Sequence, residues 1–599
     1  MTVRVAAAQI RPDKANYAEN LKRVGSVLGA VANWESPPDL VVFPETILSG
    51  LSVEGGVREN AVNAGDLLSD LAAMHAAIGA APVDVVVGFY EEFQNRYFNS
   101  AAYFTLGGTE PLIRHVHRKV FLPTYGVFDE KRFVSHGPAV NTFDTAWGRA
   151  AILICEDAWH SITGAIAALD GAQAILVPSA APARGIGPDP GARDSGAARP
   201  ASSRAWERMI CRIAEEHGVY VVVAQPVGFE GGKAFQGGSA IVAPGGDVVV
   251  CAPVFEDALI VSDLDFDAIS RARSKDHTLG DLEVQLWSVL ESSGKKPHAV
   301  EFAAADGKEI PRAPSPGEYD VLENSDTPDP LAIEPALAAR WLEAFIEDEV
   351  VRRRGFEKVV IGLSGGVDSS LTATLAARAL GPDNVVGVRM PYRTSSADSL
   401  EHAAILGQQL GIRLETVNIS AAVDAYLATV DDEADGTRKG NVMARMRMIT
   451  LFDLAAKYGA LPLGSGNKTE RLFGYFTWHG DDSPPINPLG DLYKTQVWEL
   501  ARYLGVPDEI VTKPPSADLI VGQTDEADLG ISYARADGIL HWLLGGYRPE
   551  QIVAMGFDSD EVELVNVRLN QTHWKRHLPT VAMVSHTAIG ESYLRPVDY

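Results

Sequence analysis

The segment KVVIGLSGGVDSSLTATLAARAL, residues 358–380, decides the fold of the second half of the chain. KVVIGL is an apolar run typical of a buried strand, SGGVDSS is rich in small turn-forming residues, and LTATLAARAL has the composition of a helix. Further apolar runs at 384–389 and 460–464 alternate with helix-like stretches. This alternation predicts a doubly wound parallel sheet with helices between its strands.

The SGGVDSS turn predicts an anion site. Small residues after a buried strand let backbone amides face inward, and the next helix points its N-terminus at the same place. The lysine of the GxxxxGK[ST] phosphate loop is missing, which argues against a kinase-like or GTPase-like site. Asp368 is placed to reach a magnesium ion, and Ser364 and Ser369 to reach phosphate oxygens. A Gly-rich turn without a ligand is the alternative, but SGGxDS between a strand and a helix resembles the ATP pyrophosphatases, which cleave ATP between its α- and β-phosphates.

The first half of the chain predicts a separate α/β unit. Apolar runs at 39–43, 83–90 and 219–223 read as buried strands between helix-like stretches, and the Gly-, Pro-, Ala- and Arg-rich residues 181–203 read as a loop. Periodicity disappears between about 292 and 330, where ESSGKK, APSPGEYD and NSDTPDP bring turn formers and charge. We therefore expect one domain over 1–270, a connector over 271–330 and a second domain over 331–599.

Bulk composition narrows the class of protein. At 599 residues and 46% hydrophobic content the chain predicts at least two globular units. Its formal charge of -27 disfavours nucleic acid and anionic membranes as partners. Three widely spaced cysteines without a CxxC indicate neither a disulfide framework nor a zinc site. With no apolar run of membrane-spanning length and no signal-type start, we expect a cytoplasmic protein.

Three residues in the first half have the chemistry for amide hydrolysis. Glu45 stands in FPET, Lys119 in HRKVFLPTYGVFDE and Cys155 in AILICEDAWH, each at or after a strand-like run. Hydrolysis through a thioester needs a nucleophile, a base for its proton and a positive group for the oxyanion, which Cys, Glu and Lys supply. A cysteine at the end of a strand is more often a small core residue, as we expect for Cys211.

These three segments, in this order, resemble the nitrilase-like amidases over about the first 270 residues. The resemblance implies an αββα sandwich, with Glu45 as general base, Lys119 supporting the oxyanion and Cys155 as the acyl-accepting nucleophile. By the same resemblance four further residues line a glutamine pocket: Tyr125, Glu156, Trp159 and Ser179. Edge packing of Tyr125 and Trp159, and a solvated carboxylate at Glu156, are the alternatives.

The second half resembles the NAD synthetases. The motifs KGNVMARMRM, GSGNKTE, GYFTWHGD, NPLGDLYKTQVWELA and KPPSADLIVGQTDEADLG follow SGGVDSS in family order. With the first half, the chain resembles the glutamine-dependent NAD synthetases, so glutamine, ATP and nicotinic acid adenine dinucleotide (deamido-NAD) are the expected small-molecule substrates. The residues that this resemblance assigns to magnesium are Asp368 and Glu470; to ATP, Ser364, Gly365, Gly366, Ser369, Arg445, Ser465, Lys494 and Ser516; to deamido-NAD, Asn441, Asp481, Lys575 and Arg576. A solvated helix face is the alternative for Arg445.

The implied reaction joins two chemistries. AMP transfer makes the pyridine carboxylate electrophilic, and ammonia released from glutamine then attacks the acyl-adenylate to form NAD. Ammonia would pass through an enclosed path, and the family predicts a homo-oligomer. Three alternatives are amidation of another carboxylate, an RNA-modifying second half and an amidase half that is only a scaffold. GYFTWHGD and QTDEADLG disfavour the first, the charge of -27 the second, and Glu45, Lys119 and Cys155 the third.

Overall fold

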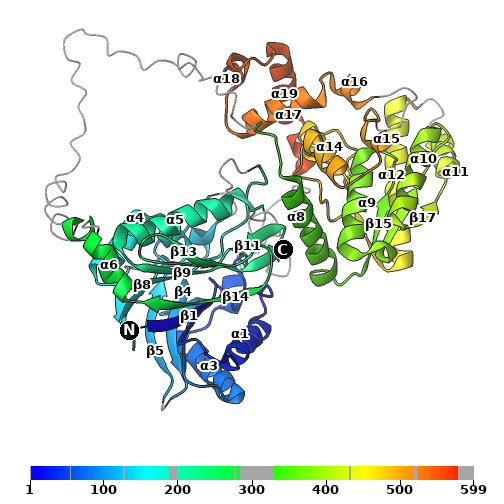
Figure 1. The fold of residues 1–599 in the computed structure, drawn as a ribbon. Helices are drawn as coiled ribbons and strands as arrows, with labels where there is room; N and C mark the ends of the chain where they lie inside the picture. Colours follow the sequence, from blue (N-terminus) through cyan, green and yellow to red (C-terminus); the bar gives the residue numbers. More distant parts are fainter. Residues whose placement is uncertain are drawn as a thin grey trace, which may run out of the picture. The chain divides into compact units, whose positions relative to one another are not determined.

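The computed structural model (Figure 1) describes residues 2–53, 56–108, 110–125, 128–188, 198–275, 278–282, 329–430, 434–516 and 524–577. These residues form two compact units. The first unit comprises the described residues of 2–185 and 199–282, and the second comprises those of 186–198 and 329–577.

Two six-stranded sheets form the centre of the first unit. In the first sheet the order is β14-β1-β2-β3-β4-β5, and in the second it is β13-β12-β9-β8-β7-β6. The first sheet contains β1 (Thr2–Gln9), β2 (Leu40–Val42), β3 (Val83–Phe93), β4 (Arg96–Leu106), β5 (Leu112–Arg118) and β14 (Ala258–Asp265). The second contains β6 (Thr142–Asp144), β7 (Arg149–Ile152), β8 (Ala174–Pro178), β9 (Tyr220–Ala224), β12 (Ala240–Val242) and β13 (Val248–Cys251). A hairpin of β10 (Val227–Glu230) and β11 (Lys233–Gln236) is separate from both.

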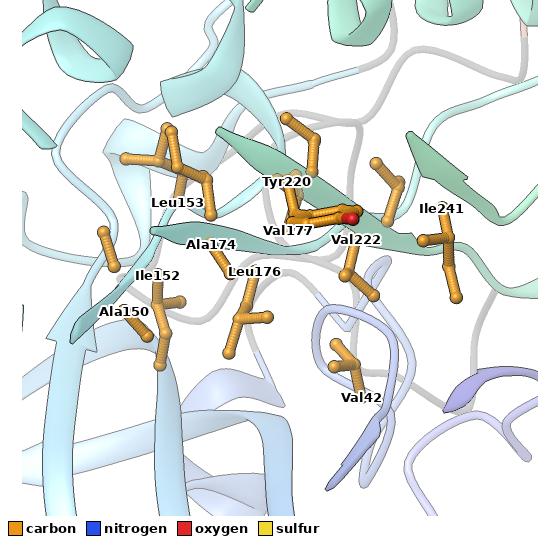
Figure 2. Close-up of a cluster of buried hydrophobic side chains, with 14 of the residues drawn as sticks. Val42, Ala150, Ile152, Leu153, Ala174, Leu176, Val177, Tyr220, Val222 and Ile241 are labelled. Carbon is orange, nitrogen blue, oxygen red and sulfur yellow. The ribbon is translucent and has the colours of Figure 1, made fainter. Parts of the chain in front are cut away.

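The alternation of side chains along the strands divides the first unit into layers. In β2, Leu40 and Val42 enter a core shared with the second sheet, while Val41 between them enters the core beneath the helices. Figure 2 shows Val42 facing Leu176 of β8 and Val222 of β9. The strands are apolar on both faces because each face is covered.

Helices cover the outer face of each sheet. α1 (Tyr17–Ala32) and α3 (Ala64–Ile78) pack on the first sheet, and α4 (Ser161–Leu169) and α5 (Ala201–His217) lie on the opposite side of the unit, against the second (Figure 1). This is the predicted αββα sandwich. The remaining helical segments are α2 (Val57–Asn60), α6 (Asp267–Lys275), η2 (Glu130–Arg132) and η3 (Cys155–Trp159).

The second unit contains a four-stranded sheet in the order β17-β16-β15-β18, and every pair in it is parallel. Its strands are β15 (Lys358–Gly362), β16 (Val385–Arg389), β17 (Arg413–Thr416) and β18 (Ala460–Leu463). The chain moves outward from β15 through β16 to β17 and then returns to place β18 on the other side of β15. Such a reversal leaves a crevice at the carboxyl ends of the two strands that flank it.

Both faces of this sheet are covered, as the doubly wound prediction requires. Val359 and Ile361 of β15 pack in one core with α9 (Val367–Leu380), and Val360 packs in another with α12 (Gly436–Tyr458). The other helical segments are α8 (Pro335–Glu347), η4 (Asp348–Arg352), η5 (Pro382–Asn384), α10 (Ala397–Leu410), α11 (Ser420–Val430), α13 (Lys468–Phe473), α14 (Lys494–Tyr503), α15 (Asp508–Val511), α16 (Asp525–Leu529), α17 (Tyr533–Leu544), α18 (Pro549–Ala554), α19 (Ser559–Gln571) and η6 (His573–Arg576).

The predicted domain limits at 270 and 331 stay predictions. α6 continues to Lys275, and most of the predicted connector 271–330 lies outside the described residues. Part of the predicted loop 181–203 also lies outside them, and α5 already begins at Ala201. Among the helices that the structure describes, none has the length and apolar content to cross a membrane.

We expect Leu176→Ala to destabilise the first unit, because Leu176 is fully buried between the two sheets. Its loss leaves a cavity that costs about 2–5 kcal/mol. Hydrogen exchange measured by mass spectrometry on the full chain should show faster exchange in peptides from β8. Leu112→Ala, at a half-exposed position on β5, is the matched control and should leave exchange unchanged. Equal protection of β8 in both variants would contradict the packing described here.

Candidate active sites in the two units

The three predicted catalytic residues of the first unit meet in one buried cluster. Glu45 follows β2, Lys119 directly follows β5, and Cys155 begins η3 just after β7. All three side chains are buried, and both Glu45 and Lys119 act electrostatically on the Cys155 thiol. β2 and β5 belong to the first sheet and β7 to the second, so the cluster lies where the ends of both sheets meet.

Lys119 is held between two carboxylates. Its Nζ donates to Glu45 Oε1 and to Glu130 Oε1, both at 2.7 Å. Asn99 Nδ2 donates to the same carboxylates, at 2.7 Å to Glu45 Oε1 and at 3.3 Å to Glu130 Oε2. Burial opposes the ammonium charge, but Glu130 and Glu45 hold the pKa of Lys119 well above its usual value. Lys119 therefore carries a positive charge beside the thiol.

Glu130 is the second carboxylate of this cluster and was not among the predicted site residues. Burial raises its pKa to about 7, with Lys119 acting in the opposite direction and Glu45 adding to the rise. In the sequence it stands in GVFDEKRF, where nothing distinguishes it from a solvated loop acid. Glu130 contacts Lys119 because η2 places its side chain in the interior, and the residue pattern of this loop does not reveal that burial.

The Cys155 thiol is protonated at rest. Burial, and then the charge of Glu45, raise its pKa far above that of a free thiol, while Lys119, the Ser179 side chain and the Ala180 amide act in the opposite direction. Cys155 also has a φ of +45°, a strained conformation for a residue with a Cβ. Glu45 Oε2 is buried and has no hydrogen-bond partner among the described residues. That oxygen is available to take the proton of the thiol.

Gly88 of β3 lets the Glu45 segment lie directly on the sheet. A Cβ at Gly88 would come within 2.5 Å of Pro44 O and 2.7 Å of Glu45 Cα. Any larger side chain would therefore push Glu45 away from Lys119. A glycine inside an apolar strand is a signal of close backbone approach that the sequence does carry.

The predicted glutamine-pocket residues divide into two groups. Tyr125 Oη donates to Glu156 Oε2 at 2.7 Å, and Ser179 is buried beside Cys155. Trp159, at 42% exposure, packs edge-on against Trp206 with ring centroids 5.4 Å apart. Tyr125 and Glu156 thus form a polar pair next to the nucleophile, whereas the contact of Trp159 is one of ordinary packing.

In the second unit the SGGVDSS segment follows β15 and starts α9, as the sequence predicts. Ser364 Oγ lies 3.0 Å from Ser369 Oγ and accepts from the Gly366 amide at 3.2 Å. Gly365 has a φ of +77°, and a Cβ there would lie 2.2 Å from Ser399 O. Only glycine fits at this position, and the turn keeps its amides and hydroxyls at the end of the strand.

A second buried lysine lies between two carboxylates in this unit. Lys494 Nζ contacts Asp368 Oδ2 and lies 3.3 Å from Glu470 Oε1. Asn467 Nδ2 donates to Asp368 Oδ1 at 2.9 Å. Burial raises the pKa of Glu470 to about 8, opposed by Lys494 and reinforced by Asp368. The predicted phosphate ligand Lys494 is thus engaged with both predicted magnesium ligands.

Two cavities with shared walls adjoin these residues. A cavity of about 220 Å³ is lined by Ser364, Gly366, Asp368, Ser369, Ser465, Glu470, Lys494 and Ser516 among others. A larger cavity of about 700 Å³ is lined by Ser364, Asn441, Ser465, Asp481 and Lys575 among others. Both open at the carboxyl ends of β15 and β18, where the strand order reverses.

Three predicted residues line neither cavity. Gly365 is turned toward Ser399, the guanidinium of Arg445 donates to Trp478 O at 3.0 Å, and that of Arg576 donates to Leu472 O at 2.8 Å. Arg447, two residues after Arg445 on α12, lines the larger cavity instead.

Lys513 and Asp525 line the smaller cavity and were not among the predicted residues. Lys513 Nζ donates to Ser399 Oγ at 2.7 Å. Asp525 accepts from Tyr475 Oη at 3.1 Å and from Tyr533 Oη at 3.2 Å. Both residues belong to the motif KPPSADLIVGQTDEADLG. The motif marks this segment as part of the site, but it does not show which of its residues line the cavity.

The carboxylates of the smaller cavity suit a divalent cation. Asp368 and Glu470 already accommodate a positive group between them, the Lys494 ammonium. Within the described ranges no group of three or more His, Cys, Asp or Glu side chains is placed to hold a metal. Two carboxylates that leave room for phosphate oxygens fit Mg²⁺, which is commonly bound by one or two carboxylates together with substrate phosphates.

Comparisons with known proteins agree with this division. Residues 4–274 match the carbon-nitrogen hydrolase family, and residues 338–579 match the NAD synthase family. An NH(3)-dependent NAD(+) synthetase of Chlorobaculum parvum is 47% identical over 273 residues, which cover 45% of this chain and 98% of the relative.

Other relatives match along almost the whole chain. A glutamine-dependent NAD(+) synthetase of Thermotoga maritima is 31% identical, with 99% of this chain and 98% of the relative aligned. The structure of a glutamine-dependent NAD+ synthetase from Acinetobacter baumannii in complex with adenosine diphosphate is similar with a TM-score of 0.70 at 25% identity, covering 100% of this chain and 98% of that one.

We expect two substitutions to move the pKa of the Cys155 thiol in opposite directions. Glu45→Gln removes a charge that raises this pKa, so alkylation of Cys155 should shift to lower pH; Lys119→Met removes a charge that lowers it, so alkylation should shift to higher pH. Iodoacetamide labelling against pH, read by mass spectrometry of the Cys155 peptide, measures both shifts. Cys211 in the same digest is the internal control and should not move. Parallel shifts in the two variants would contradict the electrostatics of the cluster.

Proposed function

This chain belongs to the glutamine-dependent NAD(+) synthetases, and we propose that it amidates deamido-NAD with ammonia that its first unit takes from glutamine. The observation that carries the proposal is one chain with two buried sites of different chemistry. A protonated thiol lies beside a free carboxylate oxygen in the unit that matches carbon-nitrogen hydrolases. A phosphate-type turn lies beside a carboxylate pair in the unit that matches NAD synthases.

In the first unit, Cys155 Sγ attacks the side-chain amide carbon of glutamine while Glu45 Oε2 takes the thiol proton. Lys119 stabilises the oxyanion, since its charge is held close to the thiol and is shielded from water. The C–N bond then breaks, and Glu45 returns the proton to the leaving nitrogen, so that ammonia departs and a thioester remains. Water, activated by Glu45, hydrolyses the thioester to glutamate and restores the thiol.

The carboxylate of Glu156 is the group in this pocket that suits the α-ammonium of glutamine. It is adjacent to Cys155 in the chain and is oriented by Tyr125. Ser179 assists at the thiol. Trp159 supports the wall of the pocket through its contact with Trp206. In this proposal the glutamine pocket is thus formed by Tyr125, Glu156, Trp159 and Ser179.

In the second unit, the deamido-NAD carboxylate attacks the α-phosphorus of ATP, and pyrophosphate leaves. Ammonia then attacks the acyl-adenylate carbon, and AMP leaves as NAD(+) forms. The turn at Ser364, Gly365, Gly366 and Ser369, together with Ser465 and Ser516, binds the ATP phosphates. Asp368 and Glu470 would hold Mg²⁺, which offsets charge that develops on the phosphates. Lys494 keeps the two carboxylates in place and Lys513 adds a positive charge to the same cavity.

The larger cavity takes the dinucleotide. Asn441, Asp481 and Lys575 line its wall, and burial raises the pKa of Asp481 to about 6. Lys575 Nζ donates to Gly474 O and Phe476 O, so it arranges the GYF segment as well as offering charge. We assign the predicted neighbour Arg576 to the same support, because its guanidinium binds Leu472 O.

The transfer of ammonia is part of the proposal. Free ammonia at neutral pH is mostly ammonium, which has no lone pair for attack, so an enclosed path between the two sites preserves the nucleophile. The predicted homo-oligomer and the predicted cytoplasmic location complete the proposal and stay predictions.

We expect Cys155→Ala to abolish NAD(+) formation from glutamine and to leave formation from ammonium within about twofold, because the thiol serves only the first unit. Initial rates with ATP, magnesium, deamido-NAD and either nitrogen donor measure the difference. Cys211→Ala, a thiol on α5 outside the cluster, is the matched control and should keep both rates. Equal loss of both rates in Cys155→Ala would contradict the division of labour, and no NAD(+) from the wild type would contradict the proposed function.

We expect Asp368→Asn to abolish NAD(+) formation with both nitrogen donors while glutamate release from glutamine continues. The substitution removes a proposed metal ligand and one of the two carboxylate partners of the buried Lys494 ammonium, with Glu470 left as the other. Incorporation of labelled pyrophosphate into ATP in the presence of deamido-NAD reports adenylation directly. Asp383→Asn, between α9 and β16, is the control. Wild-type adenylation in Asp368→Asn would contradict the role of this carboxylate.

A further inference from the structure

One buried carboxylate of the first unit has no part in the chemistry above. Asp157 is the third residue of η3, two positions after Cys155, and its side chain is fully buried. Its Oδ1 accepts from the backbone amides of Val120 at 3.0 Å and Phe121 at 2.9 Å. Its Oδ2 accepts from the Ile154 amide at 3.1 Å and from His117 Nε2 at 2.9 Å. Both oxygens are thus used by donors of the protein.

The donors to Asp157 lie next to the catalytic residues. Val120 follows Lys119, and Ile154 precedes Cys155. Lys119 extends β5 of the first sheet, whereas Cys155 extends β7 of the second. The Asp157 carboxylate therefore binds the backbone next to Lys119 and the backbone next to Cys155. These two segments extend different sheets, which no strand pairing joins in the described part of the chain.

The same carboxylate is connected to the substrate pocket. Phe121, whose amide Asp157 accepts, stacks on His160 with ring centroids 3.7 Å apart. His160 Nε2 lies 3.7 Å from Glu156 Oε1. The backbone of Asp157 also anchors α4, because Thr163 Oγ1 donates to Asp157 O at 2.6 Å.

Charge neutralisation does not account for this arrangement. Among the described residues, His117 forms an ion-pair contact with Asp157, and neither a lysine nor an arginine does. A buried carboxylate is stabilised here by directed hydrogen bonds from amides whose positions it fixes in return. The two carboxylate oxygens of Asp157 accept all four of these hydrogen bonds. An uncharged side chain of the same size could not accept all four.

We propose that Asp157 is a positioning residue for glutamine hydrolysis, which sets the distance between the Lys119 ammonium and the Cys155 thiol and aligns the Glu156 side of the pocket. The inference rests on the proposed amidase role of the first unit. It assigns to Asp157 no contact with the substrate and no proton transfer. Misplacement of a catalytic group by about 1 Å can reduce a rate about 100-fold, so such a brace has a measurable kinetic effect.

Asp157→Asn tests the brace at constant size. Asparagine keeps one acceptor oxygen for Val120 and Phe121, but its amide nitrogen is a donor and faces the Ile154 amide, which is also a donor; His117 keeps its bond only by changing tautomer. We expect kcat for glutamate release to fall about 100-fold, while KM for glutamine changes much less and ammonium-dependent NAD(+) formation is kept. Alkylation of Cys155 should shift to higher pH, because Lys119 moves away from the thiol.

Asp170→Asn is the matched control. Asp170 lies just past the other end of α4, half-exposed, and should keep wild-type kinetics and the wild-type alkylation profile. Wild-type kcat and an unmoved profile in Asp157→Asn would overturn the proposal. The proposed function fails separately, if the wild type itself releases no glutamate from glutamine or forms no NAD(+).

A second pair of variants keeps the proposal testable if Asp157→Asn does not fold. His117→Leu removes one donor to Asp157 Oδ2, whereas His117→Gln replaces it with an amide donor. We expect glutamate release to fall in His117→Leu and to recover in His117→Gln, with ammonium-dependent synthesis unchanged in both. Equal rates of glutamate release in the two variants, or a loss of ammonium-dependent synthesis in step with them, would overturn the positioning role.

Discussion

A buried ammonium needs carboxylate partners, and both candidate active sites of this protein are arranged around that constraint. Lys119 and Lys494 are each almost fully buried, and each lies between two carboxylates. Desolvating an unpaired ammonium costs several kcal/mol or more, so neither lysine can be buried until its partners are in place. In each unit, the segments that carry those partners therefore meet around the buried lysine, at the candidate site.

The partners come from different parts of each unit. In the first unit they come from the loop after β2 and from η2; in the second, Asp368 and Glu470 lie in the first turns of α9 and α13. Acidic residues are favoured at helix N-termini, while Lys494 is the first residue of α14, where the helix dipole disfavours a cation. The two carboxylates offset that disadvantage, and three helix starts are thereby held together at the cavity.

Each cluster has one negative charge more than it has positive charges. Burial raises the pKa of one carboxyl in each cluster toward neutrality, to about 7 for Glu130 and about 8 for Glu470, and the second carboxylate of the cluster adds to the rise. In the second unit the excess favours a further cation, which agrees with a magnesium site completed by phosphate oxygens. In the first unit, one carboxylate oxygen of Glu45 binds Lys119, and the other has no hydrogen-bond partner among the described residues.

The sequence predicted what depends on local pattern and failed where long-range burial decides. Six strands (β2, β3, β9, β15, β16 and β18), the SGGVDSS turn and the Glu45, Lys119 and Cys155 cluster could be found, because apolar runs and short motifs are local signals. Glu130, Asn99 and Asp157 could not, because their partners lie in segments far along the chain and polar residues in loops look solvated. Arg447 lines the larger cavity and Arg445 does not, and a helix-periodic segment alone does not show which of its faces meets a cavity.

The resting state of the thiol bears on the form in which ammonia is released. Because burial and Glu45 keep the pKa of Cys155 high, the thiol begins the reaction with its proton. In the proposed reaction that proton passes to Glu45 and then to the departing nitrogen, so the amide nitrogen would leave as neutral ammonia without drawing a proton from water. A resting thiolate would lack this proton, and the leaving group would need another acid. The acyl-adenylate that we propose for the second unit reacts with a nitrogen that has a free lone pair. Under the proposed mechanism, the electrostatics that keep the proton on the Cys155 thiol at rest therefore suit the first unit to supply ammonia in the reactive form.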